Sequence, residues 1–477
     1  MFQIILFVIL LTVIIILASY QSLKVYRAYY TSQASLEVPG PERTEEKEGN
    51  IPDIAAAGSL HEYLVKLHKE YGPITSFWMG DNHVVSIASP ELFKQHQHLF
   101  DRPPELFKLF EPMLGENSIQ YANESDGKTR RNNYDKAFAY DKMKGYYFTL
   151  QEIADEMIDK WSNVPTGEHI ALNTSISAYA LKVVLVVFFG EHFQKEEDLL
   201  SFNKAYDVCW TEMEKSLAET LSPGSDRQKR FEKAKAELRG VIKSAVEQRR
   251  DDDETDDTDT DILIDMLLEH SPSENQLFAD SVTYAVGGVH TSSNLMTWAL
   301  YYLAQNQEVQ QKVHQEIMSA LQDDEGVDAN NMGDLPYMMQ VLQETLRCAV
   351  VAPWAARFEH KDSVLGGYHI PKDTPVIHAL GVMLHDEKYW PRPDQFDPER
   401  FSPANVKRRP TLAFSPFGFA GKRICPGYKF AYAETCVLFA PLLRKFEIQM
   451  AGPQSIRGVH GLVTHPSEEI WITLRRR

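Results

Sequence analysis

The sequence predicts a mainly α fold of the α+β type, in which one large helical domain carries small β-sheets at one side. Long segments repeat apolar residues at the helical period, and short runs have the composition of strands. No Gly/Ser-rich linker or internal repeat divides the 477 residues, which favours a single large domain. The expected helices lie near 59–71, 128–160, 172–189, 226–250, 274–304, 306–322, 336–350 and 426–446. The expected strands lie near 74–79, 83–87, 364–370 and 374–380, the last two joined as a hairpin through 371–373.

The first 23 residues are almost wholly apolar and predict one N-terminal transmembrane helix. A cleaved signal peptide is the rival interpretation, but the segment lacks a positive n-region and a small-x-small cleavage site. Lys24 and Arg27 follow the apolar run, so the positive-inside rule places the rest of the chain in the cytosol. Residues 24–52 are expected to be a linker with a proline hinge, and 53–477 the catalytic domain.

Composition excludes some classes of function. Acidic residues outnumber basic ones by 67 to 49, a net charge of −18, which argues against nucleic acid as a partner. Much of the excess lies in 251–261, an Asp/Thr run that is expected to be a solvated loop because it lacks the glycine turn and terminal glutamate of a calcium loop. The four cysteines show no metal or disulfide spacing, which fits a reducing compartment.

One cysteine stands at the tip of a glycine-rich loop. Cys425 follows Lys422 and Arg423 and precedes an apolar run that is expected to be a helix. A helix N-terminus and nearby cations favour the thiolate, which can act as a metal ligand or a nucleophile. A lone cysteine ligand suits the axial position of haem iron, because the porphyrin supplies four other donors. A buried structural cysteine is the competing interpretation.

Two further elements carry charge or unusual glycines. Glu344 and Arg347 share one face of an apolar helix, and a buried pair of this kind needs further donors. Arg400, in a rigid proline-rich loop, is a candidate. Adjacent glycines at 287 and 288 lie in the middle of the 274–304 helix and cost about 1 kcal/mol each. They suggest a groove for a flat ligand, with a tolerated glycine pair at a helix crossing as the alternative. Thr291 could bond the carbonyl of Gly287 and open the helix locally.

Together these elements resemble the cytochromes P-450, haem-thiolate monooxygenases. Gly421-x-Arg423-x-Cys425-x-Gly427 matches their haem-binding loop position for position. The resemblance implies a P-450 fold, haem b as cofactor and Cys425 as the iron ligand. The aromatic position of the loop holds Gly418, flanked by Phe417 and Phe419, so we expect a one-residue shift with Phe419 and Gly421 at the cofactor.

The glycine-containing helix is similar to the oxygen-activating groove of the same family. Gly287, Gly288, Thr291 and Ser292 match it, whereas the acid position holds His290, as in the sterol 14-demethylases. The resemblance implies that Thr291 orients dioxygen or a water and that His290 assists proton delivery. A structural role for the histidine stays open.

The resemblance also assigns the remaining charged residues. Glu344, Arg347 and Arg400 match the Glu-x-x-Arg and Pro-Glu-Arg-Phe elements, which form a structural lock in the family. The residues that match arginines at the haem propionates, each with solvated surface as an equal alternative, are Arg131, Arg357 and Arg423. Gly127 occupies the position of the usual tryptophan, which implies one missing propionate contact.

At finer resolution both ends of the chain are similar to family 20 of the cytochromes P-450, a group with no settled substrate. The stretches that carry this similarity are 44–53, 58–62, 71–78 and 468–474. The resemblance implies a single-pass protein of the endoplasmic reticulum membrane that oxidises a hydrophobic small molecule (sterol, fatty acid or xenobiotic). The expected electron donor is an NADPH–cytochrome reductase, with cytochrome b5 as a second candidate, because no dinucleotide fingerprint is present.

Two alternatives remain open on sequence. One is a haem-thiolate isomerase or dehydratase that acts on peroxides without a reductase, and the other is a haem-binding sensor without turnover. Thr291 favours the monooxygenase, because oxygen activation needs that hydroxyl and peroxide rearrangement does not.

Overall fold

The computed structural model describes residue 12, residue 17 and residues 19–22, 38–215, 221–253, 262–322 and 325–477. Most of the expected membrane anchor, the first part of the expected linker and most of the acidic 251–261 run lie outside these residues. Of the described helices, one, α9 (Leu172–Phe189), is long and apolar enough to cross a membrane, and it is largely buried within the domain. It is therefore a core helix.

Helices make up most of the described chain. The long ones are α3 (Leu60–Tyr71), α7 (Glu124–Tyr134), α8 (Tyr140–Ser162), α9, α10 (Glu196–Lys215), α11 (Asp226–Asp253), α13 (Glu274–Gln305), α14 (Gln307–Ala320), α15 (Pro336–Ala349) and α18 (Tyr428–Lys445). The short ones are α2 (Ile51–Ala57), α4 (Pro90–His96), α5 (Pro104–Phe107), α6 (Glu111–Leu114), α12 (Leu263–His270), α16 (Leu380–Leu384) and α17 (Pro403–Val406), with 3₁₀ turns between several of them.

The strands form four small sheets. The largest has the order β1 (Ile74–Met79), β2 (Asn82–Ile87), β7 (Val376–His378) and β4 (Ala355–Arg357), with the β2–β7 pair parallel and the other pairs antiparallel. A second has the order β3 (Ile170–Ala171), β11 (Trp471–Arg476) and β8 (Phe446–Met450). Two two-stranded sheets pair β5 (Ser363–Leu365) with β6 (Tyr368–Ile370), and β9 (Gly458–His460) with β10 (Thr464–Pro466).

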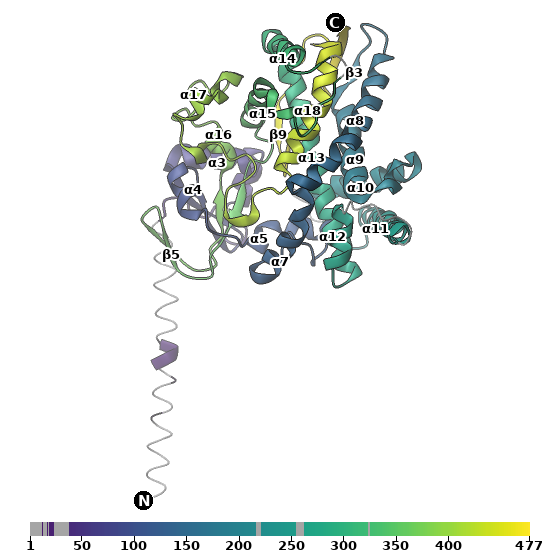
Figure 1. Ribbon diagram of the computed structural model, residues 1–477. Helices are drawn as coiled ribbons and strands as arrows, with labels where there is room; N and C mark the ends of the chain where they lie inside the picture. The colour runs from purple at the N-terminus through teal and green to yellow at the C-terminus, as the bar shows by residue number, and fades with distance from the viewer. Residues whose placement is uncertain are drawn as a thin grey trace, which may run out of the picture.

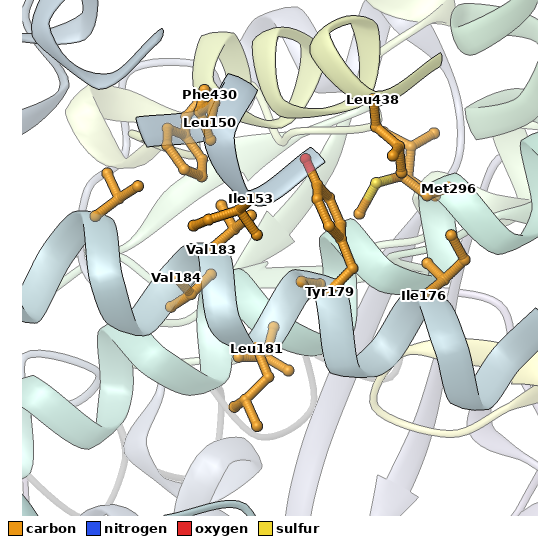
Figure 2. Close-up of a cluster of buried hydrophobic side chains, with 14 of the residues drawn as sticks. Leu150, Ile153, Ile176, Tyr179, Leu181, Val183, Val184, Met296, Phe430 and Leu438 are labelled. Carbon is orange, nitrogen blue, oxygen red and sulfur yellow. The ribbon is translucent and has the colours of Figure 1, made fainter. Parts of the chain in front are cut away.

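The main core is helical. Helices α8, α9, α13 and α18 lie alongside one another, while the β1–β2–β7–β4 sheet lies with α3 and α4 on the other side of the domain (Figure 1). Helix α9 is apolar on most of its circumference, so it is buried by neighbours on several sides. One face of it packs against α13 and the opposite side meets α8 and α18, as Figure 2 shows for Leu150, Val183 and Phe430.

Three local expectations are corrected. The expected helix over 128–160 is two helices, α7 and α8, separated by a 3₁₀ turn at Asp135–Phe138. The expected hairpin through 371–373 is wrong: β5 and β6 pair with each other inside 363–370, and β7 joins the large sheet between β2 and β4. Helix α10 is absent from the helices that the sequence predicted.

The expected linker also ends earlier than residue 52. Val38 is buried, and the amide of Ser76 on β1 donates to the Pro39 carbonyl over 2.8 Å. An added Cβ at Gly40 would lie 1.9 Å from the Ser76 carbonyl oxygen, so only glycine permits this approach. The segment from 38 onward therefore belongs to the folded domain.

Candidate functional site

A cavity of about 380 Å³ lies between α13 and the loop that precedes α18. Cys425 and Thr291 both line it, although they are far apart in the sequence. The remaining wall is mainly apolar and aromatic, contributed by Phe107, Phe110, Phe138, Phe188, Leu295, Leu346, Val351, Trp354, Leu380 and Phe430 among others. A larger surface groove of about 690 Å³ beside α6, α11 and α13 contains none of the predicted site residues.

The cysteine loop reaches the cavity through a tight turn. The amide of Cys425 donates to the Phe417 carbonyl over 3.0 Å, and Gly418 between them has a φ of 78°, which glycine adopts without strain. Helix α18 begins at Tyr428, with Gly427 as its N-cap residue. Cys425 therefore lies three residues before the first residue of α18, close to a helix N-terminus, as expected.

Phe419 and Gly421 are corrections. Phe417 and Gly418 line the cavity, whereas Phe419 turns away and stacks on Phe93 with ring centroids 4.5 Å apart. Gly421 also lies outside the cavity lining, and its amide donates to the Gln97 carbonyl over 2.6 Å. An added Cβ at Gly421 would lie 2.5 Å from the Leu99 carbonyl oxygen. Both residues hold the loop against α4 and the segment after it.

The thiol itself is held neutral by its surroundings. Burial raises the pKa of Cys425, although the backbone N–H of Gly427 and the charge of Arg131 act in the opposite direction. We expected the helix N-terminus to favour the thiolate, but burial outweighs it in the protein alone. A bound metal cation reverses this balance, because it deprotonates a coordinating thiol outright.

The two glycines of α13 are accommodated for different structural reasons. Gly287 faces open space, with no atom within 4 Å of an added Cβ, whereas a Cβ at Gly288 would lie 2.8 Å from Val184 of α9. Gly288 therefore permits close helix packing, and Gly287 leaves the cavity wall flat. The Thr291 hydroxyl donates to the Gly287 carbonyl, which confirms the predicted bond within the helix.

His290 is a second correction, because the structure places it away from the cavity. Its ring lies against Trp210 of α10 at a centroid distance of 3.6 Å and is also stacked with Tyr206. It lines a separate pocket of about 200 Å³ together with Glu214 and His465. Burial lowers the pKa of His290 to about 3, so the ring is neutral. A residue beside Thr291 in sequence points elsewhere because consecutive helical positions are about 100° apart.

Arginines converge on the cavity from three other segments. Arg131 (α7), Arg357 (β4) and Arg423 line it, as predicted, and all three are buried. Arg131 pairs with Asp135 at 2.8 Å. Among the described residues, Arg357 Nε and both Nε and Nη2 of Arg423 have no hydrogen-bond partner.

Arg102 is a fourth cavity arginine that sequence analysis missed. Burial and repulsion from the other three lower its pKa well below the usual value, and the same causes bring the pKa of Arg423 to about 9. Two prolines follow it directly, at 103 and 104, and they fix the backbone as the prolines around Arg400 do. The Pro103–Pro104 pair could therefore have identified Arg102 as a candidate site residue from the sequence.

The glycine at the expected tryptophan position has a steric cause. A Cβ at Gly127 would lie 2.2 Å from the Ala122 carbonyl oxygen and 2.7 Å from Arg423 Nη2. The Arg423 guanidinium therefore occupies space that a side chain at 127 would need. Arg102 supplies a guanidinium on this side of the cavity instead.

Glu344, Arg347 and Arg400 are brought together away from the cavity lining. Arg347 donates to both carboxylate oxygens of Glu344, at 2.7 and 2.8 Å, and also to the carbonyls of Leu384 and Gln395. Arg400 lies 3.3 Å from the same carboxylate. The Asp397 amide adds a further donor to Glu344 over 2.9 Å. The group ties α15 to the proline-rich loop, as its sequence predicts.

The cavity fits a flat dianionic ligand with a metal centre. Buried guanidinium nitrogens without hydrogen-bond partners are suited to anions, and haem carries two propionate carboxylates. The apolar walls suit the macrocycle, and one cysteine faces the same space. Arg102, Arg357 and Arg423 would hold the carboxylates, and Cys425 the iron.

Comparisons with known proteins agree with this geometry. The family model described as Cytochrome P450 matches residues 39–472. Cytochrome P450 20A1 of Rattus norvegicus is 34% identical over 94% of this chain and 95% of its own length. The human Cytochrome P450 20A1 is 32% identical over the same shares. Cytochrome P450 4V2 of Mus musculus is 26% identical over 87% of this chain and 83% of its own length.

Proposed function

This chain belongs to the cytochrome P450 family, whose members bind haem b through a cysteine thiolate, and on that premise we propose that it is a membrane-anchored monooxygenase acting on a hydrophobic small molecule. The observation that carries the proposal is that Cys425 and Thr291 line one apolar cavity, whose lining also includes Arg357 and Arg423 with nitrogens that have no hydrogen-bond partner among the described residues. Haem supplies the iron chemistry, and a thiolate axial ligand favours O–O bond cleavage.

The residues of this chain have separate tasks in the proposal. Cys425 would hold the iron, and Arg102, Arg357 and Arg423 would hold the propionates, with Arg131 also in the cavity lining and paired with Asp135. The Thr291 hydroxyl proton is directed to the Gly287 carbonyl, so its oxygen presents lone pairs to the cavity. There it can accept a hydrogen bond from a water, and holding dioxygen would require the hydroxyl to turn its proton from the Gly287 carbonyl into the cavity. The aromatic wall around Phe107, Phe110 and Trp354 excludes water and favours an apolar substrate such as a sterol, fatty acid or xenobiotic.

An NADPH–cytochrome reductase is the proposed electron donor, with cytochrome b5 as a second one. The proposed location is the endoplasmic reticulum membrane, with the domain in the cytosol. The sequence contains two N-glycosylation sequons, Asn123-Glu-Ser125 and Asn173-Thr-Ser175. Both asparagines make hydrogen bonds in the folded domain: Asn123 donates to the Arg102 carbonyl and Asn173 to the Glu468 carbonyl. These contacts favour unmodified side chains. A mobility shift on endoglycosidase treatment would place the domain in the lumen instead.

The first experiment tests the cysteine. Cys425→Ser should abolish the red-shifted carbon-monoxide Soret band of the ferrous protein, because a hydroxyl does not replace the thiolate. Cys436→Ser is the matched control, since Cys436 lies on α18 and is buried outside the cavity lining. Retention of the band in the Cys425 variant contradicts the assignment.

The second experiment separates the monooxygenase from a peroxide isomerase. Thr291→Ala should keep its haem and its ligand-induced spectral shifts, but it should uncouple NADPH consumption from product formation in the presence of reductase. Compounds from a sterol and fatty-acid panel serve as substrates. Full product yield from organic peroxides by the Thr291→Ala protein, without reductase, would overturn the proposal in favour of the isomerase.

A further inference from the structure

Arg102 is surrounded by like charges. It lines the cavity together with the guanidiniums of Arg131, Arg357 and Arg423. Burial and repulsion from these three lower the pKa of Arg102 well below its usual value. A long arginine side chain relieves such repulsion by turning its charged end to solvent. A place for this guanidinium in the cavity therefore requires groups that hold it there.

Gln120 holds the guanidinium. Its side-chain amide oxygen accepts a hydrogen bond from Arg102 Nη1, and Gln120 itself lines the cavity. An amide oxygen binds a guanidinium without neutralising it. Arg131 differs, because its charge is already paired with the Asp135 carboxylate at 2.8 Å. Arg102 therefore keeps its full charge for an anion inside the cavity.

Asn123 holds the backbone of the same residue. Its Oδ1 accepts from the Arg102 N–H over 2.9 Å, and its Nδ2 donates to the Arg102 carbonyl over 2.8 Å. Asn123 is the N-cap residue of α7, where an asparagine side chain usually accepts from an amide of its own helix. Here the side chain makes no such capping bond. Both ends of its amide bond Arg102 instead.

The loop between α6 and α7, which carries Gln120, is fixed to α13. The Ile119 N–H donates to Oδ1 of the fully buried Asp280 over 2.6 Å. The Ser118 hydroxyl bonds the Thr283 hydroxyl over 2.6 Å and accepts from the Gln120 amide over 3.0 Å. Backbone and side chains together therefore set the position of Gln120 relative to the helix that forms the cavity wall.

We propose that Gln120 and Asn123 are positioning residues for Arg102, which hold its guanidinium in the cavity so that it meets an anionic group of the cofactor. This role rests on the proposed function, because the anions are the propionates of haem. It also accounts for Gly127, since an arginine held from the α6–α7 loop supplies a contact that the residue at 127 cannot make.

The rate of haem loss tests this role without turnover. Full-length, haem-loaded protein in lipid nanodiscs is mixed with an excess of a haem-scavenging globin, and the decay of its Soret band is followed. Gln120→Leu and Asn123→Ala should each accelerate haem loss by between about twofold and tenfold, the range that corresponds to one hydrogen bond. Asn117→Ala is the matched control, because Asn117 is an exposed residue of the same loop that contributes its backbone carbonyl to Arg130. Its rate should equal that of the parent.

A double-variant cycle separates the positioning of Arg102 from a general effect on the fold. In an Arg102→Gln background, Gln120→Leu should add no further acceleration, because the guanidinium that it holds is gone. In an Arg357→Gln background it should still accelerate haem loss, because Arg357 bonds other groups, the carbonyls of Ala356 and Ala420. Equal acceleration in both backgrounds would contradict the role and indicate a general loss of stability.

The outcomes separate the two proposals. A parent protein without the red-shifted carbon-monoxide Soret band, even after haem is added, overturns the proposed function and the positioning role with it. If the parent shows the band and either variant leaves haem loss unchanged, the role assigned to that residue is overturned while the proposed function stands. Gln120→Leu keeps the test available if Asn123→Ala fails to fold.

Discussion

Two buried groups of arginines in this protein differ in where their charge is balanced. Around Glu344, the guanidinium of Arg347 meets a carboxylate and two carbonyls from its own chain. Around the Cys425 cavity, Arg357 and Arg423 have nitrogens without described partners, and mutual repulsion contributes to their lowered pKa values. A group that is complete within the chain supports the fold, whereas an incomplete group is suited to a ligand that brings the missing anions.

The same contrast holds for two buried carboxyls. Glu344 accepts from Arg347 and from the Asp397 amide. Glu434 of α18 is fully buried and has neither a cation nor a backbone donor among the described residues, and burial raises its pKa to about 8. The Glu344 carboxylate meets a guanidinium inside the protein, whereas the Glu434 carboxyl meets no cation and stays neutral near pH 7. Each prediction below alters one side of these comparisons, in order of decreasing expected effect.

The largest effect is expected at Glu344. Glu344→Gln leaves the Arg347 charge buried without its carboxylate, so the free energy of unfolding should fall by about 3–5 kcal/mol. Chemical denaturation, followed by circular dichroism of the haem-loaded protein, measures the change. Glu399→Gln in the same loop region is the control, because Glu399 is exposed and pairs with Lys312 at the surface. An equal loss in both variants would show that the buried lock has no special role.

The second prediction is a gain in the free energy of unfolding, and the gain depends on pH. Because the pKa of Glu434 is raised from 4.5 to about 8, the native protein must keep this proton while the unfolded chain releases it above about pH 4.5. The parent therefore loses stability between about pH 4.5 and 8, and Glu434→Gln does not. Relative to their difference at pH 5, the variant should gain about 3–4 kcal/mol over the parent at pH 8.

Unfolding curves of both proteins across this range provide the measurement. Tyr179 and Ser292 are the described polar groups that interact with the carboxyl, and neither titrates in this window. A stability difference that is the same at pH 5 and pH 8 would contradict the raised pKa.

The third effect concerns ligand affinity. Removing one cavity arginine, as in Arg357→Gln, should weaken haem binding about tenfold, equal to about 1.4 kcal/mol, because one charged partner of a carboxylate is lost. The apoprotein should not be destabilised, since repulsion among four like charges is reduced. Haem titration and unfolding of the apoprotein are measured together. Weaker binding accompanied by an equally destabilised apoprotein would indicate a structural role instead.

The fourth effect, similar in size to the third, tests the packing of Arg423 over Gly127. Gly127→Ala places a Cβ against the Ala122 carbonyl and Arg423 Nη2, so it should cost about 1–2 kcal/mol of stability and lower haem affinity. Gly145→Ala in α8 is the control, because nothing lies within 4 Å of its added Cβ. That control should gain up to about 1 kcal/mol from helix propensity. Thermal unfolding distinguishes the two signs.

Relations within a single element were predictable from the sequence. The Thr291 bond to Gly287 follows from a spacing of four, and the Glu344–Arg347 pair from a spacing of three on one helix. Helix boundaries such as those of α9 and α13 also agreed closely with the apolar pattern. In these cases the helical period alone fixes which groups are neighbours.

Relations between elements were decided only by the tertiary structure. His290 turns to Trp210 because α10 packs on that side of α13, and β7 pairs with β2 because the large sheet offers it an edge. In the cysteine loop Phe417 lines the cavity, whereas Phe419 packs against Phe93, because the chain turns at Gly418 between them. The prolines after Arg102 indicate a rigid backbone, and the apolar neighbours of Glu434 indicate a buried charge. Neither pattern indicates which part of the fold the side chain contacts. Sequence spacing determines direction within one helix or loop, whereas the packing of distant segments determines what each side chain meets.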